Sequence, residues 1–201
     1  MPKSVGIQTI DIIEVPPVAP TIEIKKPILT PFDEDAREFE KLTLYKSNMF
    51  IDEDKLTGHK YVNAYNAKAN DNKERIYLAV SDDAENWKRY LEKPILDETK
   101  TIKGLAISGD PQIVKIDDLY VMFFFRLVED VGAYNTFACS KNLVDWTIWD
   151  GEPLIKSELE WENQYAHKSC VVKYDGIVYH YYCAVNDKGE RFIALATSER
   201  L

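Results

Sequence analysis

The feature that most constrains the fold of this sequence is an internal repeat. Residues 76–96 and 136–155 each contain an apolar run, then a tryptophan, then a proline. In both copies an alanine precedes the tryptophan by eight residues, a serine precedes it by six, and the proline follows it by seven. A third copy begins at residues 192–198, without its tryptophan. The repeat predicts stacked copies of one supersecondary unit. The matching residues are Ala79, Ser81, Trp87 and Pro94 in the first copy, and Ala138, Ser140, Trp146 and Pro153 in the second.

The segments in front of these copies repeat as well. Residues 111–119 align with residues 169–177, and each segment has strand-like runs around a tight turn, Asp117-Asp118 or Asp175-Gly176. Two such runs around a two-residue turn predict a β-hairpin. Each full unit is therefore a four-stranded antiparallel meander of about 45 to 60 residues, which is typical of a propeller blade.

We accordingly predict an all-β, propeller-like domain with blade units at about 36–97, 106–156 and 163–201. Residues 1–35 are rich in proline. We expect a strand at residues 7–15, followed by an ordered arm that completes a blade. A single helical turn is expected between residues 33 and 41, with Asp35 as its cap.

Composition and charge exclude several classes of function. The net charge of −9 and the pI of about 4.9 argue against a nucleic-acid or anionic-membrane partner, since both require a basic surface. No apolar run is long enough to span a membrane. The three cysteines lack metal-ligand spacing and are expected to be buried, reduced thiols. The absence of a signal-peptide pattern at Met1 gives the cytoplasm as the expected compartment.

A resemblance follows from these motifs. The unit Ile-x-x-Ala-x-Ser-x-x-x-x-x-Trp, with Asp110-Pro111 and a strand rich in tyrosine and phenylalanine, resembles the blade of the five-bladed propeller glycosidases. This group contains glycoside hydrolase families 43, 32, 68 and 130. Residues 108–114, 165–168 and 182–187 are most similar to a bacterial branch that is family 43-like or family 130-like. The resemblance covers residues 38–201.

The resemblance implies an enzyme that cleaves glycosidic bonds of an oligosaccharide or glycoside in an axial pocket. Alternatives are a phosphate-dependent glycoside phosphorylase, a non-catalytic carbohydrate-binding propeller and a protein-interaction propeller. This chain has about three units where the group has five blades, so it is similar to a truncated member. Exposed sheet edges would then allow a homodimer.

The first strand of each propeller blade lines the axial pocket, which gives candidate site residues. The match of residues 45–48 to residues 167–170 sets the register between units. Polar side chains at positions flanked by strand hydrophobics point to a pocket, although strand-start and turn-forming roles are the alternative. The aligned residues are Lys46, Asp110 and Lys168, preceded by Tyr45, Gly109 and His167.

Glycosidic cleavage requires a carboxylic acid and, in hydrolysis, a second carboxylate. The resemblance implies that Asp110 is one of three axial carboxylates. Glu40 and Glu162, just ahead of the first and last units, are the other catalytic candidates, with solvated loop positions as the alternative for each.

The remaining candidates would bind substrate. Lys46, His167 and Lys168 would hold an anion, either phosphate or a carboxylated sugar. Tyr45, Trp161 and Tyr165 would stack on sugar faces. No cofactor or metal ligand set is expected; the resemblance allows axial calcium, and phosphate as a co-substrate. The residues alone do not determine the sugar, the linkage or the stereochemistry.

Overall fold

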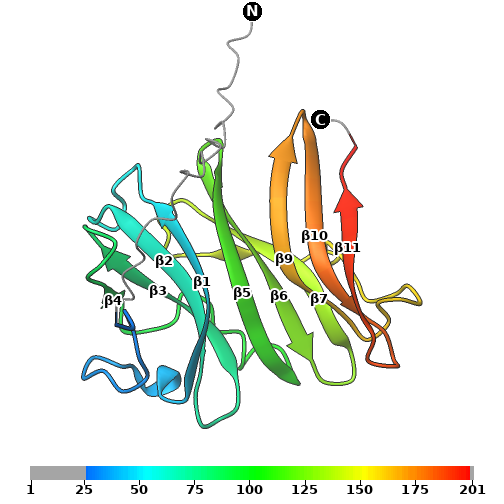
Figure 1. Ribbon diagram of the computed structural model, residues 1–201, viewed down its shortest axis with the longest axis horizontal. Helices are drawn as coiled ribbons and strands as arrows, with labels where there is room; N and C mark the ends of the chain where they lie inside the picture. The colour runs from blue at the N-terminus through cyan, green and yellow to red at the C-terminus, as the bar shows by residue number, and fades with distance from the viewer. Residues whose placement is uncertain (1–25, 200–201) are drawn as a thin grey trace, which may run out of the picture.

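A computed structural model describes residues 26–199, and almost all of its regular structure is β-strand (Figure 1). The expected strand at residues 7–15 lies outside the described residues. No helix among the described residues is long and apolar enough to cross a bilayer. The elements are η1 (Glu38–Glu40), β1 (Thr43–Ile51), β2 (Tyr61–Lys68), β3 (Glu74–Ser81), β4 (Lys88–Tyr90), β5 (Leu105–Ile116), β6 (Leu119–Val128), β7 (Gly132–Ser140), β8 (Thr147–Ile148), β9 (Tyr165–Tyr174), β10 (Ile177–Val185) and β11 (Arg191–Thr197).

The strands form three consecutive meanders, which we call units one, two and three. Unit one is β1-β2-β3-β4, unit two is β5-β6-β7-β8, and unit three is β9-β10-β11, with antiparallel pairing throughout each unit. Single parallel pairs join neighbouring units, Glu74 with Ile107 and Ala133 with Tyr165. The sequence prediction of repeated meanders is confirmed.

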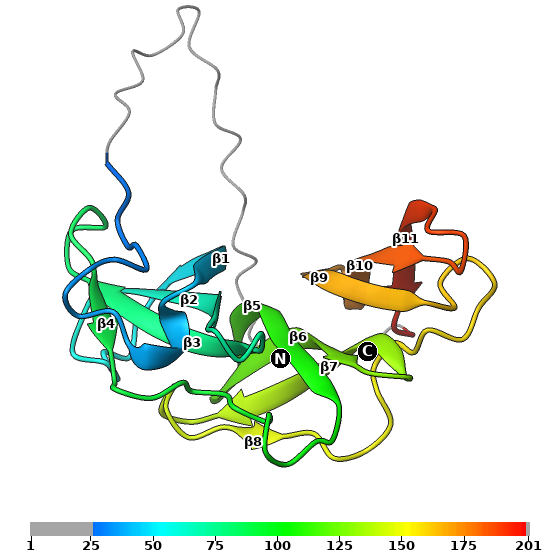
Figure 2. The same ribbon diagram turned by 90° about the horizontal axis from the view of Figure 1, so that it is seen from below.

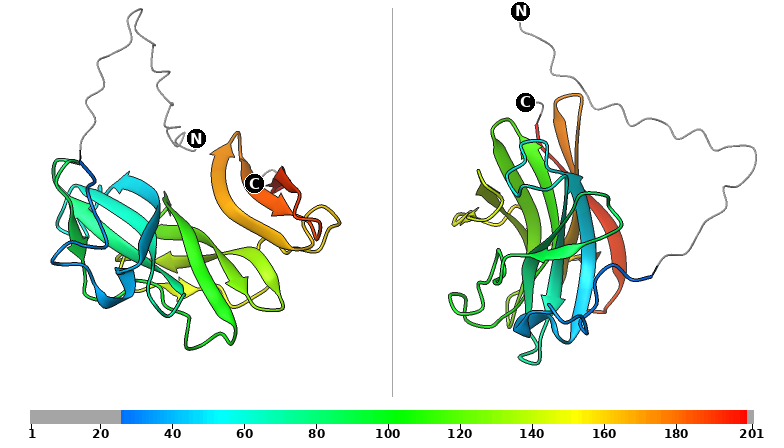
Figure 3. Two further views of the ribbon diagram at one scale, coloured as in Figure 1. Left: turned by 60° about the horizontal axis from the view of Figure 1, so that its bottom comes forward. Right: turned by 90° about the vertical axis from the view of Figure 1, so that its left-hand side faces the viewer.

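The three units are arranged as an open arc. Viewed end-on, β1, β5 and β9 lie on the concave side, whereas β4, β8 and β11 lie toward the outside (Figure 2). The views in Figure 3 show the same arrangement. This is the blade geometry of a β-propeller, in which the first strand of each unit borders the axis.

The main core lies between units one and two because side chains on one face of each meander interdigitate. Burying an aliphatic or aromatic side chain of this size contributes roughly 1.5–3 kcal/mol. The strands at the centre of unit one are buried on both faces and consequently read as continuous apolar runs. The principal core residues are Val62, Ala64, Ile76, Leu78 and Val80 of unit one, and Ile113, Met122, Phe124, Ala138 and Leu143 of unit two.

The spacing of serine and tryptophan in the repeat is explained by one turn that occurs twice. In unit one, the Ser81 hydroxyl accepts the N–H of Ala84, and the Asp83 carboxylate accepts the N–H groups that follow. The Trp87 indole N–H then donates to the Ala84 carbonyl over 2.9 Å. Unit two repeats these contacts with Ser140, Asn142, Leu143 and Trp146.

The segment 26–41 covers the face of unit one that points away from unit two. The Glu40 carboxylate accepts hydrogen bonds from Arg37, Tyr65 and Arg89. The expected helical turn is the 3-10 turn η1, but its cap is Arg37 rather than Asp35. Asp35 pairs with Arg89 instead, because that buried guanidinium requires anions around it. The described part of the N-terminal arm contains no strand.

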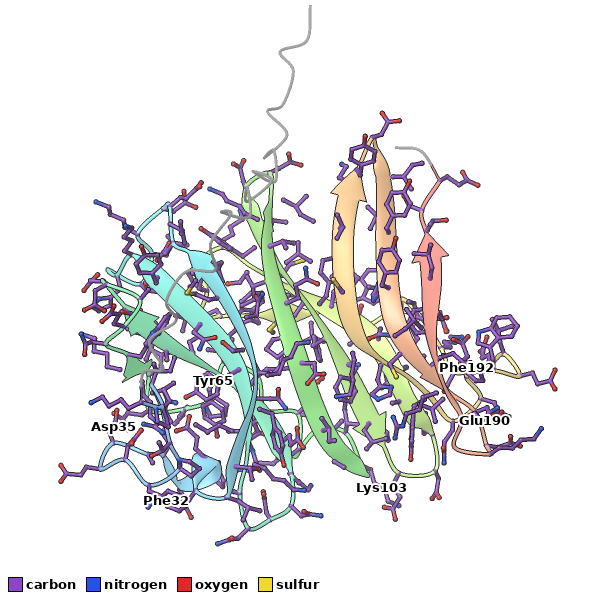
Figure 4. All side chains as sticks on the ribbon, in the orientation of Figure 1. Phe32, Asp35, Tyr65, Lys103, Glu190 and Phe192 are labelled. Atoms are coloured by element: carbon purple, nitrogen blue, oxygen red, sulfur yellow. The ribbon has the colours of Figure 1, made fainter. Side chains whose placement is uncertain are left out.

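Unit three has an open face, which is the face that in unit one packs against unit two. In the repeat alignment, Ile193 and Leu195 on β11 match Ile76 and Leu78, which are fully buried in unit one. Ile193 is 82% exposed and Leu195 is 48% exposed. Phe192 marks this outer edge in Figure 4, whereas Tyr65 lies over unit one. The expectation of three buried thiols is wrong: Cys170 is exposed because it lies next to this open side of the arc, and Cys139 and Cys183 are only partly buried.

Candidate active site on the first strands

The three aligned positions Lys46, Asp110 and Lys168 share one backbone feature. Each has a positive φ, of 43°, 53° and 63° respectively. Each also lies where the pairing register shifts between the first and second strands of its unit. A bulge turns the side chain out of the regular alternation. The aligned positions are therefore structurally equivalent. Their strained backbone conformation lies on the first strands, which border the propeller axis.

Amide side chains hold the first strands of neighbouring units together. The Asn48 Oδ1 atom accepts the N–H of Ile113 over 2.8 Å, linking β1 to β5. At the equivalent position in unit two, the Gln112 amide accepts the N–H of Val171 over 2.7 Å and donates to its carbonyl over 3.0 Å. These links fix the spacing between β1, β5 and β9, and hence between the three bulges.

Asp110 is the buried anion of this region. Its Oδ2 atom lies 3.2 Å from the Lys168 ammonium nitrogen, and the two side chains are 8% and 52% exposed. The structure thus brings together two of the predicted site residues, from units two and three. Lys46 is exposed and forms no ion pair with any residue that the structure describes.

His167 lies beside this pair and is mostly buried. Its Nδ1–H group donates a hydrogen bond to the Cys183 carbonyl over 3.1 Å, and its ring packs edge-on against Phe125 and Tyr165. Burial lowers the pKa of His167, and the neighbouring Lys168 charge lowers it further. His167 therefore borders the site as a largely buried polar ring, and its predicted role in binding an anion stays a prediction.

Two further polar residues, Asn66 and Glu74, complete the cluster. The Asn66 Oδ1 atom accepts the backbone N–H of Asp110 over 3.2 Å, and its Nδ2 atom donates to Glu74 over 2.5 Å. Gly109 permits this approach, since a Cβ atom there would lie 3.0 Å from the Asn66 Nδ2 atom. Burial raises the pKa of Glu74, and the Asp110 carboxylate adds to this effect. Sequence reasoning missed both residues; the available signal was a pair of asparagines within the buried run of β2.

Glu40 and Glu162 have no contact with this cluster. Glu162 is buried and accepts the hydroxyl of Tyr182 over 2.5 Å. Glu40 accepts the hydroxyl of Tyr65 over 2.6 Å. Tyr65 and Tyr182 occupy equivalent positions opposite the bulges of units one and three. These two carboxylates thus anchor the segment ahead of a unit to its second strand, and their predicted catalytic role stays a prediction.

The predicted aromatic residues are dispersed. Trp161 lines a cavity of about 780 Å³ on the outer side of unit three, together with Phe192 and Ile193. Tyr165 contacts the His167 ring, so it borders the cluster. Tyr45 is 41% exposed next to the first bulge.

The axial residues do not suit calcium. Calcium requires six to eight oxygen ligands. Here the Lys168 ammonium occupies the position beside the Asp110 carboxylate. Among residues 26–199, no group of three histidine, cysteine, aspartate or glutamate side chains is arranged to hold a metal ion.

An arc of antiparallel meanders whose first strands lie on the concave side has the architecture of a β-propeller, and comparison with solved structures of glycoside hydrolases confirms this fold. A protein described as a glycoside hydrolase superimposes with a TM-score of 0.80 and 43% identity, covering 89% of this chain and 52% of that chain. A complex of BT0996 with RGII gives a TM-score of 0.79 and 43% identity over 88% of this chain and 51% of that protein. A thermostable family-43 glycoside hydrolase shares the fold at 18% identity, with a TM-score of 0.65 over 88% of this chain and 57% of that chain.

The resemblance read from the sequence is thereby confirmed. The chain spans about half the length of the two structures that it matches at 43% identity. A 1,2-beta-oligomannan phosphorylase of Thermoanaerobacter sp. (strain X514) is 40% identical over 76 residues, which are 36% of this chain and 24% of that protein. No family model matches the sequence.

Proposed function

We propose that this protein is a carbohydrate-active enzyme that hydrolyses glycosidic bonds of an oligosaccharide at the Asp110 cluster. The observation that carries the proposal is the buried Asp110 carboxylate at the axial bulge, paired with Lys168 and linked through Asn66 to Glu74. A glycoside hydrolase with 43% identity over 89% of this chain supports the reaction class. Cleavage requires two carboxyl groups at one site, and Asp110 and Glu74, which are joined through Asn66, are the pair that we assign to it.

Phosphorolysis is the second candidate reaction. The match to an oligomannan phosphorylase favours it, as does the half-exposed Lys168 ammonium beside Asp110. In phosphorolysis, phosphate attacks the anomeric carbon, so a protein base is not required. A lysine charge near the anomeric carbon would attract that phosphate.

The experiment incubates the full chain with a panel of oligosaccharides, in buffer alone and with inorganic phosphate, and identifies the products by mass spectrometry. Free sugars in buffer alone support hydrolysis. Sugar phosphates that form only with inorganic phosphate support phosphorolysis. Binding that shifts the unfolding midpoint without product would instead indicate a carbohydrate-binding propeller.

Asp110→Asn is expected to reduce turnover by at least about 10²-fold, because the substitution removes a charge that acts on the reacting centre. The matched control is Asp54→Asn. Asp54 also pairs with a lysine, Lys115, but it lies on the exposed hairpin side of the protein. Equal turnover by the Asp110→Asn variant and the wild type would contradict this site assignment.

We further propose that two copies associate through the open face of unit three. Ile193, Leu195 and Tyr181 form an apolar sheet surface whose equivalents in unit one are buried. The opposite end of the arc is already covered by residues 26–41, so two unit-three faces would pair with each other in a symmetric dimer. Such an interface buries the apolar edge that would otherwise promote aggregation.

Sedimentation equilibrium tests this association. The wild type is expected to be a dimer, and Ile193→Lys is expected to be a monomer because the charge would be buried in the interface. Phe32→Lys is the matched control, since Phe32 is 88% exposed on the covered end of the arc. A monomeric wild type would rule the dimer out.

The cytoplasm is the proposed compartment, supported by three cysteines that form no disulfide with one another. Cell fractionation of the source organism with a specific antibody would locate the protein. Recovery outside the reducing compartment would overturn the proposal.

A further inference from the structure

Glu74 has an unusual environment for a carboxyl group. It is the first residue of β3, only 9% exposed, and its one described hydrogen bond comes from the Asn66 amide. No ion pair reaches it from another residue in the range 26–199. A buried carboxyl group without a cationic partner is favoured in its neutral form.

Asp110 has the opposite environment. The Lys168 ammonium lies 3.2 Å from its Oδ2 atom, so Asp110 has the cationic partner that Glu74 lacks. Burial raises the pKa of Glu74 most; the Asn66 hydrogen bond and the Lys68 charge lower it, the Asp110 carboxylate raises it, and Lys168 lowers it. The two carboxyl groups are therefore within electrostatic range of each other, and only Asp110 has a cation in contact.

Asn66 fixes how the two groups lie relative to each other. Its amide is only 1% exposed, and it donates to Glu74 while accepting from the backbone of Asp110. Only one orientation of the amide satisfies both contacts, because Glu74 accepts and the Asp110 N–H donates. Asn66 is thus a positioning residue for both carboxyl groups.

From this geometry we propose, resting on the hydrolytic function proposed above, that Glu74 is the proton donor of the site and Asp110 its charged partner. Neutral Glu74 gives its proton to the glycosidic oxygen as the bond from the anomeric carbon to that oxygen breaks, so the leaving sugar departs as an alcohol. Water adds to the anomeric carbon and loses its proton to Asp110. Exchange with solvent then returns a proton to Glu74 and removes one from Asp110.

The first test measures the coupling without any substrate. The carboxyl carbon of Glu74 is titrated by carbon-13 NMR in the full chain, and its resonance is identified by its loss in Glu74→Gln. The midpoint is expected above the ordinary value of 4.5. Asp110→Asn is expected to lower the midpoint, and Lys168→Met is expected to raise it.

Matched controls separate local coupling from a general change of charge. Asp54→Asn and Lys115→Met remove the same charges from an exposed pair on another surface. They are expected to leave the Glu74 midpoint unchanged. The proposal of a shared site is overturned if the Glu74 midpoint is unchanged in Asp110→Asn, or if Asp54→Asn shifts it by the same amount.

The second test uses leaving groups of different basicity. The phenolate of an aryl glycoside with an acidic phenol leaves without protonation, whereas the leaving sugar of an oligosaccharide must be protonated. Glu74→Gln is expected to lose about 10²–10⁴-fold on the oligosaccharide and much less on the aryl glycoside. Asp110→Asn is expected to lose activity on both substrates.

The outcomes distinguish the two levels of the proposal. Equal losses for Glu74→Gln on both substrates overturn the donor role alone and leave the hydrolytic function standing. No turnover by the wild type on any glycoside overturns the function and the donor role together, while the NMR result still decides whether Glu74 and Asp110 share one site.

Discussion

At the scale of single residues, the buried carboxylates of this protein fall into two kinds. Glu40 accepts hydrogen bonds from Arg37, Tyr65 and Arg89, so both of its oxygens have firm partners. Glu74 has one amide donor, and Asp110 has one lysine that is half exposed to solvent. A fully satisfied carboxylate holds structure together, whereas a partly satisfied one remains available to a ligand.

Glu40→Gln should therefore affect stability rather than chemistry. The substitution leaves two buried guanidinium groups without their shared anion, and removing one partner of a buried ion pair costs about 3–5 kcal/mol in the free energy of unfolding. Urea unfolding monitored by tryptophan fluorescence measures this loss. Asp35→Asn is the control, since Asp35 is an exposed partner of the same Arg89 and should cost at most about 1 kcal/mol.

If Glu40→Gln keeps its stability but loses turnover, the structural role is wrong and the catalytic prediction for Glu40 from the sequence stands. The same comparison applies to Glu162, which has a single tyrosine partner.

At the scale of elements, the side-chain amides between first strands hold each unit against the next. Gln112→Ala removes both hydrogen bonds to the backbone of Val171 and leaves that N–H unpaired. Unsatisfied buried donors cost about 1–3 kcal/mol. We expect the amides of β9, β10 and β11 to exchange faster with solvent deuterium, while β2 and β3 keep their protection.

Asn48→Ala is the matched variant for this measurement. It removes the equivalent hydrogen bond to Ile113, so the increased exchange should appear in β1 instead. Uniform acceleration across the chain in either variant would show global rather than unit-by-unit opening.

The elements also show what the sequence alone can predict. The repeat placed the hairpins and the Trp turns correctly because these features depend on local residue order. It also aligned Lys46, Asp110 and Lys168, because bulges at equivalent positions keep the register of the repeat. Glu74 was missed because its place in the site depends on the parallel junction of β3 with β5, which no local pattern encodes.

At the scale of the whole molecule, stability should depend on pH through His180. Burial lowers the pKa of His180 to about 4 from an ordinary value of 6.5. Between these values the unfolded chain binds more protons than the folded one, so stability is complete above pH 6.5 and falls as the pH decreases toward 4. The full effect is about 3 kcal/mol.

Unfolding curves at several pH values check this dependence. His180→Asn is expected to flatten the dependence of the free energy of unfolding on pH between about pH 6.5 and 4. His59→Asn is the control, since His59 pairs with Asp82 at the surface, and it should leave this dependence unchanged. Asp71 and Asp97 have a lowered pKa, so their protonation destabilises the folded state only below about pH 4. The pH range of the aspartates is therefore separate from the range of His180. An unchanged slope in His180→Asn would assign the dependence to other groups.

The bulges have a consequence for how such a protein can change its chemistry. Lysine, aspartate and lysine occupy three copies of one strained backbone conformation, so that conformation does not select the charge of its side chain. A cation, an anion or a neutral group can therefore replace one another at each bulge without a change in the strands around it. Specificity in this architecture can diverge through a substitution at one bulge while the other bulges stay unchanged.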